Sequence, residues 1–288
     1  MPCRRPLFVG GYIAISFMEN KVFFVSGIDT DAGKSYATAY LACEWNKKGI
    51  RTITQKFIQT GNVGHSEDID LHRKIMVREG VISKSKLPAD KTFITANGKI
   101  LNGDEAAEAE RLGVMSWPLT SPEIYSYPAS PLLSSRLDNR PVNFGKIEAA
   151  TSILAERYDR VLLEGAGGLM VPIAEKSDSR IAEMVKEMEK AGYPSAKNAN
   201  NAILTIDYVA YKKYPMVFVS SGKLGSVNHT LLSLEAIETR GIKIAYFCYN
   251  LYPELEDKTI LSDTMDYLKR EVAVRFPEAE FVEIPVAE

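Results

Sequence analysis

The residues best suited to chemistry follow an apolar run near the start of the chain. The segment Gly27–Ser35 reads GIDTDAGKS and lies between the run KVFFVS and a helical pattern. A glycine-bounded loop of this kind, ending in Gly-Lys-Ser between a strand and a helix, is typical of a phosphate-binding loop. Gly33 lets the backbone approach a phosphate, Lys34 places a cation on the β- and γ-phosphates, and the Ser35 hydroxyl can coordinate Mg²⁺. Five residues separate Gly27 from Gly33, whereas the ordinary motif has four.

Two charged residues lie at the ends of other predicted strands. Lys56 closes the stretch RTITQK, and Glu164 closes RVLLE before the turn GAGG. Ligands of parallel sheets bind beyond the carboxyl ends of the strands, so both groups are expected at the same edge. Lys56 can neutralise developing phosphoryl charge, with a solvated strand-end lysine as the alternative. Glu164 stands where P-loop enzymes place a magnesium-side carboxylate, and a turn without a ligand is the alternative for the glycines.

Three further positions carry weaker signals. Asp68 opens a helical pattern, so its carboxylate can serve magnesium, stabilise the helix N-terminus, or do both. Gly225 and Ser226 open another helix within KLGSVNH, which makes a second potential anion site. Asn250 ends the predicted strand IKIAYFCY, where an amide can contact a nucleobase edge or simply make a turn.

The elements that must position these residues alternate between strand and helix. Apolar runs predict strands at residues 21–26, 51–57, 160–164, 216–220, 242–249 and 280–284. Helical periodicity predicts helices at about 34–48, 68–78, 144–158, 228–239 and 257–274. This alternation implies right-handed βαβ units. The expected fold is α/β, a three-layer parallel sheet of P-loop NTPase type with helices on both faces.

The expected organisation is a single domain over residues 18–288 with two insertions, at about 82–117 and 175–206. The Pro- and Ser-rich stretch 118–136 predicts an extended surface segment. The first 17 residues hold two arginines and an apolar run too short to span a bilayer, with no small-residue cleavage site after it. They predict a dispensable extension, and translation from Met18 would start just before the first strand.

Composition and charge exclude several classes of protein. The 288 residues are 45% hydrophobic and 25% charged, which argues against a disordered, collagen-like or polytopic membrane protein. Lys and Arg number 35 against 37 Asp and Glu, so no global basic field exists, and neither nucleic acid nor membrane is an expected partner. Cys3, Cys43 and Cys248 form no zinc or disulfide pattern, which suits a reducing, cytoplasmic location. The three histidines have no metal-ligand spacing.

Taken together, the segments resemble the dethiobiotin synthetase family, ATP-dependent ligases of biotin biosynthesis. The matching stretches are FFVSGIDTDAGKS, QKFIQTG, EDIDLHR, PASP, LLEGAGGLMVPI, SSGKLGSVNHTLL, and CYN with VEIP near the C-terminus. The resemblance makes the longer phosphate loop a family feature. It implies that CO₂ forms a carbamate on one amine of 7,8-diaminononanoate, that ATP phosphorylates it, and that the second amine closes the ring.

The resemblance also implies a set of site residues. ATP and Mg²⁺ are the implied cofactors, and Lys34 and Lys56 are the implied catalytic cations. The implied magnesium ligands are Ser35, Asp68 and Glu164. The implied nucleotide contacts are Asp31, Ala32, Gly33, Lys34, Ser35, Tyr36, Asp68, Glu164, Gly165, Ala166, Gly167, Asn250, Pro285, Val286 and Ala287.

Substrate contacts are implied at Thr60 and at a helix N-terminus that the family takes from the other subunit of a homodimer. The residues at that N-terminus are Gly225, Ser226, Val227 and Asn228. A homodimer with its active site at the interface is therefore expected. One position departs from the family, because Leu132 follows Ser-Pro where a histidine is common.

Two related classes and one broader class compete with this interpretation. A ParA-like ATPase would carry a lysine five residues before Lys34, and this chain has Asp29 there. A cobyrinate-type amidotransferase would need an appended glutaminase, which is not expected from the few residues after the last predicted strand. A non-ligase regulatory P-loop ATPase stays open as the alternative. ATP turnover that depends on diaminononanoate and bicarbonate would discriminate between it and the ligase.

Overall fold

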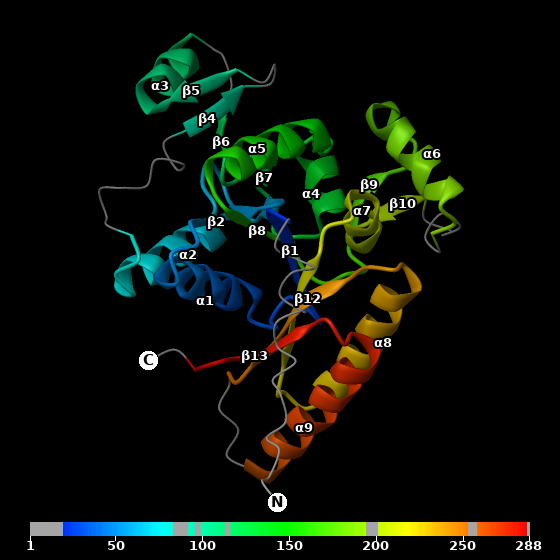
Figure 1. The fold of residues 1–288 in the computed structure, drawn as a ribbon. Coiled ribbons are helices and arrows are strands. Elements are labelled where there is room, and N and C mark those ends of the chain that lie inside the picture. Colours follow the sequence, from blue (N-terminus) through cyan, green and yellow to red (C-terminus); the bar gives the residue numbers. More distant parts are fainter. Residues whose placement is uncertain are drawn as a thin grey trace, which may run out of the picture.

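A central parallel sheet organises the molecule (Figure 1). The computed structural model describes residues 20–82, 92–95, 99–112, 116–193, 201–252 and 258–286. The sheet has six strands in the order β13-β12-β11-β1-β8-β2, and all of its pairings are parallel. Its strands are β1 (Val22–Gly27), β2 (Thr52–Lys56), β8 (Arg160–Glu164), β11 (Met216–Ser221), β12 (Ile244–Asn250) and β13 (Glu280–Ile284). All six carboxyl ends therefore lie at one edge, as the α/β prediction requires.

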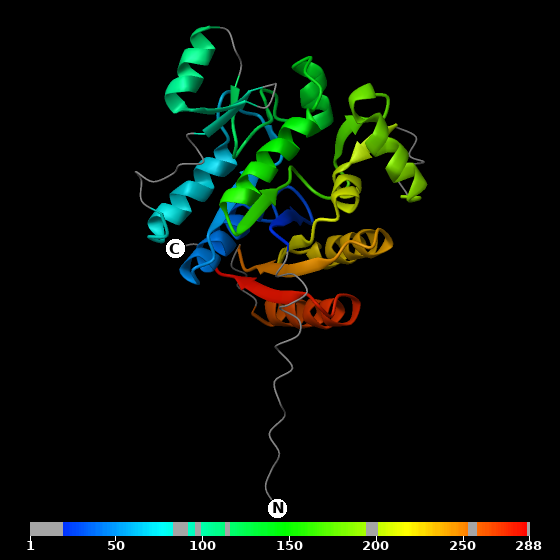
Figure 2. The same cartoon turned by 45° about the horizontal axis from the view of Figure 1, so that its top comes forward.

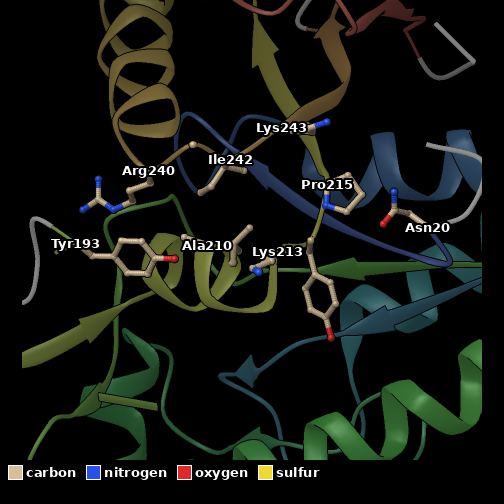
Figure 3. Close-up of a pocket in the computed structure, with 11 residues that line it drawn as sticks. Asn20, Tyr193, Ala210, Lys213, Pro215, Arg240, Ile242 and Lys243 are labelled. Carbon is tan, nitrogen blue, oxygen red and sulfur yellow. The ribbon is translucent and has the colours of Figure 1, made fainter. Parts of the chain in front are cut away.

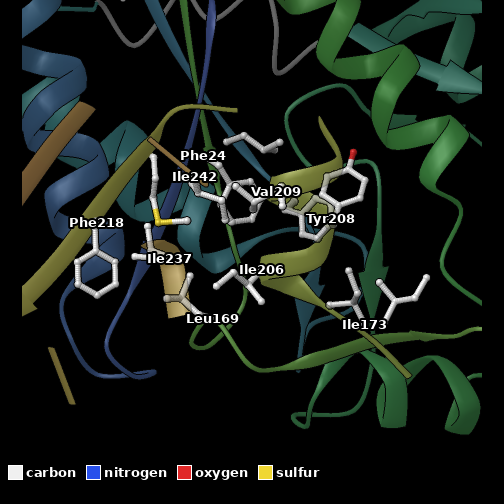
Figure 4. Close-up of a cluster of buried hydrophobic side chains, with 14 of the residues drawn as sticks. Phe24, Leu169, Ile173, Ile206, Tyr208, Val209, Phe218, Ile237 and Ile242 are labelled. Carbon is white, nitrogen blue, oxygen red and sulfur yellow. The ribbon is translucent and has the colours of Figure 1, made fainter. Parts of the chain in front are cut away.

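Helices cover both faces of the sheet and make the three layers expected from the sequence. The helices are α1 (Lys34–Lys47), α2 (Glu67–Arg78), α5 (Phe144–Arg157), α7 (Thr205–Lys212), α8 (Ser226–Thr239) and α9 (Lys258–Arg275). Side chains alternate along β1, so Phe23 and Val25 pack with α1 and α2 while Phe24 packs with α7, α8 and α9. Figure 4 shows the second of these clusters, with Phe24 near Val209 and Tyr208 of α7. Because each face of the sheet buries its own set of largely apolar side chains, the register of the strands is fixed.

Local sequence sets the helix boundaries nearest the phosphate loop. Gly33 precedes α1 in a left-handed conformation with φ 87°, and Gly49, with φ 82°, follows its end. The Ser66 hydroxyl accepts a hydrogen bond from the Ile69 amide and caps α2, whose first turn carries Asp68. These caps fix where the side chains of Lys34 and Asp68 leave the backbone.

Small sheets form within or beside the two expected insertions. The first holds β4 (Thr92–Thr95), β5 (Ile100–Asn102), α3 (Gly103–Arg111) and β6 (Ser116–Pro118). The second region holds β9 (Pro172–Glu175), η1 (Ser179–Ile181), α6 (Ala182–Lys190) and β10 (Ala202–Leu204). Figures 1 and 2 show α3 and α6 lying well away from β12 and β13. The first 17 residues and Ala287, named in the sequence predictions, lie outside the described residues.

The prediction of an extended surface segment at 118–136 is wrong in two ways. It contains β7 (Ile124–Tyr125), which pairs with β3 (Gln59–Thr60), and the start of α4 (Pro131–Leu137). Pro131 occupies the first turn of α4, where proline costs no hydrogen bond, and the Ser130 side chain caps it. Glu123 and Tyr125 have no exposed surface. The Pro- and Ser-rich composition therefore belongs to a helix start beside a buried strand pair.

No helix in the described ranges is long and apolar enough to cross a bilayer.

Candidate active site

The phosphate loop links β1 to α1, and close packing requires glycine at both of its ends. A Cβ on Gly27 would lie 2.9 Å from the Val219 carbonyl oxygen, and one on Gly33 would lie 2.1 Å from Asn250 Nδ2. The buried Lys34 ammonium donates to the carbonyl oxygens of its own loop, at 2.6 Å for Asp29 and 3.2 Å for Thr30. Burial lowers the pKa of Lys34 to about 8, although the Glu164 carboxylate opposes this shift. The loop thus holds a cation that can exchange backbone oxygens for phosphate oxygens.

Three oxygen-bearing side chains from three elements converge beside this loop. The Ser35 hydroxyl of α1 lies 2.7 Å from Asp68 Oδ1 of α2 and 2.8 Å from Glu164 Oε1 of β8. Hard oxygen donors of this kind suit Mg²⁺, which usually keeps several waters and phosphate oxygens among its ligands. Within the described ranges, no three His, Cys, Asp or Glu side chains gather closely enough to hold a metal ion by themselves. The residues therefore fit a magnesium ion that is completed by a nucleotide.

Lys56 lies inside this cluster and not in solvent. Its ammonium is 2.5 Å from Asp68 Oδ2 and 2.9 Å from Glu164 Oε1, and it donates to the Gly165 carbonyl oxygen at 3.0 Å. Burial alone would lower the pKa of Lys56, but the two carboxylates outweigh it and raise the pKa above its usual value. The solvated-lysine alternative is wrong, because Lys56 is only 4% exposed. The cluster therefore keeps a permanent cation beside the phosphate loop.

Glu164 is fully buried and remains charged. Burial would raise its pKa, but the Lys56 ammonium and His72 outweigh burial and hold the pKa of Glu164 well below its usual range. His72 Nε2 lies 2.8 Å from Glu164 Oε2. The spacing between histidines in the sequence gave no indication of this residue. The available signal was its position on α2, four residues after Asp68 and therefore on the same helical side.

The glycines after β8 have clear packing roles. A Cβ on Gly165 would lie 2.9 Å from the Phe24 ring, and Gly167 adopts φ 68°. These contacts and this φ value support the alternative explanation from the sequence, in which the glycines serve a tight turn. Gly168 packs against the backbone of the phosphate loop, with the position of a Cβ 3.6 Å from the Gly27 and Ile28 carbonyl oxygens. The turn therefore borders the phosphate site, while nucleotide contacts by Gly165, Ala166 and Gly167 stay predictions.

The residues predicted near the base fall into two groups. Asn250 Nδ2 donates to the Ala32 carbonyl oxygen at 3.1 Å, so this side chain lies against the phosphate loop. Tyr36, Pro285 and Val286 line one pocket of about 430 Å³ along α1. The structure thus brings Tyr36 together with Pro285 and Val286. Asn250, at the end of β12, instead lies against the phosphate loop.

The predicted substrate residues lie on β3 and at the N-terminus of α8. Thr60 is half-buried on β3. Gly225 precedes α8 with φ 87°, and both Gly225 and Asn228 are exposed. The Lys223 ammonium donates to the Asp31 carbonyl oxygen at 2.9 Å, which holds the start of α8 beside the phosphate loop of its own chain. Leu132 is buried on α4 and offers no polar atom where the family commonly has histidine.

A second pocket of about 430 Å³ opens at the opposite edge of the sheet (Figure 3). Asn20, Pro215 and Lys243 line it, and each directly precedes or lies near the amino end of a central strand. Arg240 also lines it and is paired with Asp207 at 3.0 Å. This pocket contains none of the residues predicted for the site, so the candidate chemistry belongs to the carboxyl edge.

Comparisons with known proteins identify a matching family model and several similar proteins. A family model described as an AAA domain matches residues 21–188. A Pasteurella multocida protein named ATP-dependent dethiobiotin synthetase BioD 2 is 36% identical over 261 residues, which are 91% of this chain and 95% of that protein. A Haemophilus influenzae protein of the same name is 39% identical over 236 residues, 82% of this chain and 94% of its own. The Chlorobaculum tepidum protein named ATP-dependent dethiobiotin synthetase BioD is 35% identical over 269 residues, 93% of this chain and 87% of its own.

Proposed function

The chain belongs to the ATP-dependent dethiobiotin synthetases, and we propose that the cluster of Ser35, Lys56, Asp68 and Glu164 is its catalytic centre. As a member of this family it is an ATP-dependent ligase that forms C–N bonds from diaminononanoate and CO₂. The observation that carries the assignment of residues is the convergence of these four side chains, from α1, β2, α2 and β8, beside the phosphate loop.

In this proposal the protein positions the reactants and neutralises charge. Phosphoryl transfer from ATP to a carbamate leaves little covalent chemistry to the enzyme. The Lys34 ammonium moves from the Asp29 and Thr30 carbonyl oxygens to the β- and γ-phosphates, and Lys56 faces the transferring group. Thr60, on the short strand that follows β2, contacts the amine end of the substrate.

Magnesium belongs to the proposal because the donors present suit it. Ser35, Asp68 and Glu164 would hold the ion directly or through water. Bound there, Mg²⁺ would offset the negative charge of the phosphates during transfer. The net charge of Lys56 with the two carboxylates is −1, which favours a divalent cation at this position.

The carboxylate end of the substrate needs a binding site of its own. Its carboxylate lies a hydrocarbon chain away from the amines, beyond the reach of the phosphate loop. We propose that the exposed N-terminus of α8, with Gly225, Ser226, Val227 and Asn228, binds this carboxylate across the interface of a homodimer. The positive dipole end of a helix N-terminus favours such an anion, and backbone amides of the first turn can donate to it.

One assay tests the activity. Phosphate release should require both diaminononanoate and bicarbonate, and mass spectrometry should detect dethiobiotin. Lys34→Gln should lower turnover by about 10²-fold, the effect of one lost transition-state donor. ATP hydrolysis that does not depend on diaminononanoate would instead favour a non-ligase regulatory P-loop ATPase.

A complementation experiment tests the shared site. Lys56→Ala should act mainly on kcat, since its charge matters most in the transition state. Asn228→Asp should raise KM for diaminononanoate, because the new carboxylate repels that of the substrate. Mixing the two variants should restore partial activity, since one mixed site contains both native elements. No recovery despite demonstrated subunit exchange would place the carboxylate site within one chain.

The domain boundary is also a proposal. A chain that begins at Met18 should fold and turn over normally, because β1 starts only at Val22. A large fall in melting temperature on this truncation would show that the first 17 residues pack on the domain.

A further inference from the structure

One buried ring connects three of the four elements that carry the catalytic cluster. His72 has no exposed surface. It lies on α2 with Asp68, its Nδ1 is 3.0 Å from Thr54 Oγ1 of β2, and its Nε2 is 2.8 Å from Glu164 Oε2 of β8. Thr54 in turn lies two residues before Lys56 on the same strand. Movement of this ring would therefore disturb the elements that bear Asp68, Lys56 and Glu164.

The partners of His72 indicate which ring nitrogen carries the proton. The Glu164 carboxylate can only accept a hydrogen bond, so His72 Nε2 carries a hydrogen and donates to Oε2. Thr54 Oγ1 accepts from Arg73 Nη1 at 2.7 Å, and its own hydroxyl proton is donated to His72 Nδ1. In this arrangement Thr54 Oγ1 and both ring nitrogens of His72 have matched partners.

The two oxygens of Glu164 are thereby given different tasks. Oε2 accepts from His72, whereas Oε1 faces the Ser35 hydroxyl and the Lys56 ammonium. Only Oε1 points into the cluster proposed for the metal. Magnesium requires near-ideal octahedral geometry, whereas calcium tolerates more ligands and accepts a carboxylate through both oxygens.

We infer that His72 is a positioning residue that holds Glu164 as a one-oxygen ligand and so favours magnesium over calcium at this site. The inference rests on the proposed function, because it needs Glu164 on the metal side. His72 does not touch the reactants in this arrangement. It acts through the carboxylate that it orients, as hydrogen-bond partners of metal ligands do.

The experiment measures metal binding without turnover. Mn²⁺ binding to the full chain in the presence of ADP is followed by electron paramagnetic resonance, and Mg²⁺ and Ca²⁺ are then titrated as competitors. His72→Leu should weaken Mn²⁺ binding by about tenfold or more, the effect of losing such a partner. It should also reduce the preference for Mg²⁺ over Ca²⁺. His72→Gln keeps an N–H donor and should recover part of both.

A matched control lies on α5, which carries none of the residues proposed for the metal or the nucleotide. Leu154 is buried there and packs in a core cluster with Ile53 of β2 and Val161 of β8. Leu154→Ala should lower the melting temperature and leave Mn²⁺ affinity and the Mg²⁺ preference unchanged. In the metal-free wild-type protein, ¹⁵N chemical shifts should show His72 protonated at Nε2 and unprotonated at Nδ1.

The outcomes separate the inference from the proposed function. If Glu164→Gln leaves Mn²⁺ affinity unchanged, the metal assignment of the proposed function fails. If Glu164→Gln weakens binding while folded His72→Leu keeps the wild-type affinity and ion preference, the inference about His72 alone is overturned. Should His72→Leu not fold, the Gln variant and the ¹⁵N shifts decide, and a wild-type ring without a proton at Nε2 overturns the inference.

Discussion

Glu164 and Glu123 are both without exposed surface, and each carboxylate meets a lysine ammonium. The two lysines nevertheless differ in charge behaviour. Lys56 faces Asp68 as well as Glu164, and these carboxylates raise its pKa despite burial. For Lys146, burial outweighs the single carboxylate of Glu123 and lowers the pKa to about 8. Because burial acts on both lysines, the number of carboxylates that each one faces decides the direction in which its pKa shifts.

The Glu123 cluster consists of Glu123, Tyr125, Arg140 and Lys146, and its contacts indicate a structural role. Arg140 pairs with Glu123 at 2.8 Å, and the Tyr125 hydroxyl donates to it at 2.6 Å. The Lys146 ammonium lies 3.5 Å from the centre of the Trp117 ring. This cluster of one carboxylate and two cations has a net charge of +1 and is enclosed by aromatic rings. The Glu164 cluster has a net charge of −1 and borders the phosphate loop, so a divalent cation can still be added.

The largest effect should come from removing the lysine of the catalytic cluster. Lys56→Met should lower kcat by about 10²–10³-fold, since a preorganised donor to developing charge is lost. The measurement is steady-state phosphate release with saturating diaminononanoate. Near-normal kcat in a folded Lys56→Met protein would mean that Lys56 has a structural role, which is the role that we infer for Lys146.

The matched change in the second cluster should affect stability instead. Lys146→Met leaves the buried Glu123 carboxylate with fewer partners, and urea unfolding should show a loss of about 3 kcal/mol. Turnover of the folded protein should stay within a few-fold of wild type, because Lys146 lies outside the catalytic cluster. A loss of kcat like that of Lys56→Met would contradict the distinction between the two clusters.

Much of the fold and of the placement of the candidate site could be predicted from the sequence. The six central strands coincide with the predicted runs, and the glycine loop lies between a strand and a helix as expected. Lys56 and Glu164 were expected at one edge because the strand ends of a parallel sheet share it, and the two side chains lie 2.9 Å apart. These placements depend only on local pattern together with one rule of topology.

The failures depend on partners far apart in the chain. His72 acquires its role from Glu164, 92 residues later, and no spacing rule connects them. Glu123 lies in a segment expected at the surface, and only its pairing with Arg140 and Lys146 makes its burial tolerable. The strand pair β3 and β7 has two residues on each side, too few for alternation to show. Tertiary contacts decide such positions.

A moderate effect should appear in the metal dependence of the first cluster. Asp68→Asn and Glu164→Gln each replace a carboxylate by a neutral amide, which is a poorer ligand for a hard cation. The Mg²⁺ concentration for half-maximal activity should rise by about tenfold or more in each. Glu123→Gln is the control and should leave this concentration unchanged. An unaltered titration for Glu164→Gln would assign that residue to the turn after β8.

The smallest effect concerns the pH dependence of stability and follows from the lowered pKa of Lys146. Burial lowers that pKa to about 8 from the ordinary 10.5. Between these values the unfolded chain holds a proton that the folded chain has released, so a rise in pH stabilises the folded state. The stability of wild type relative to Lys146→Met should therefore increase by about 1 kcal/mol from pH 8 to pH 9. Urea unfolding of both proteins at each pH measures this difference and cancels groups that titrate equally in both. A difference that is constant or falls with pH would mean that the second cluster, like the first, holds its lysine as a permanent cation.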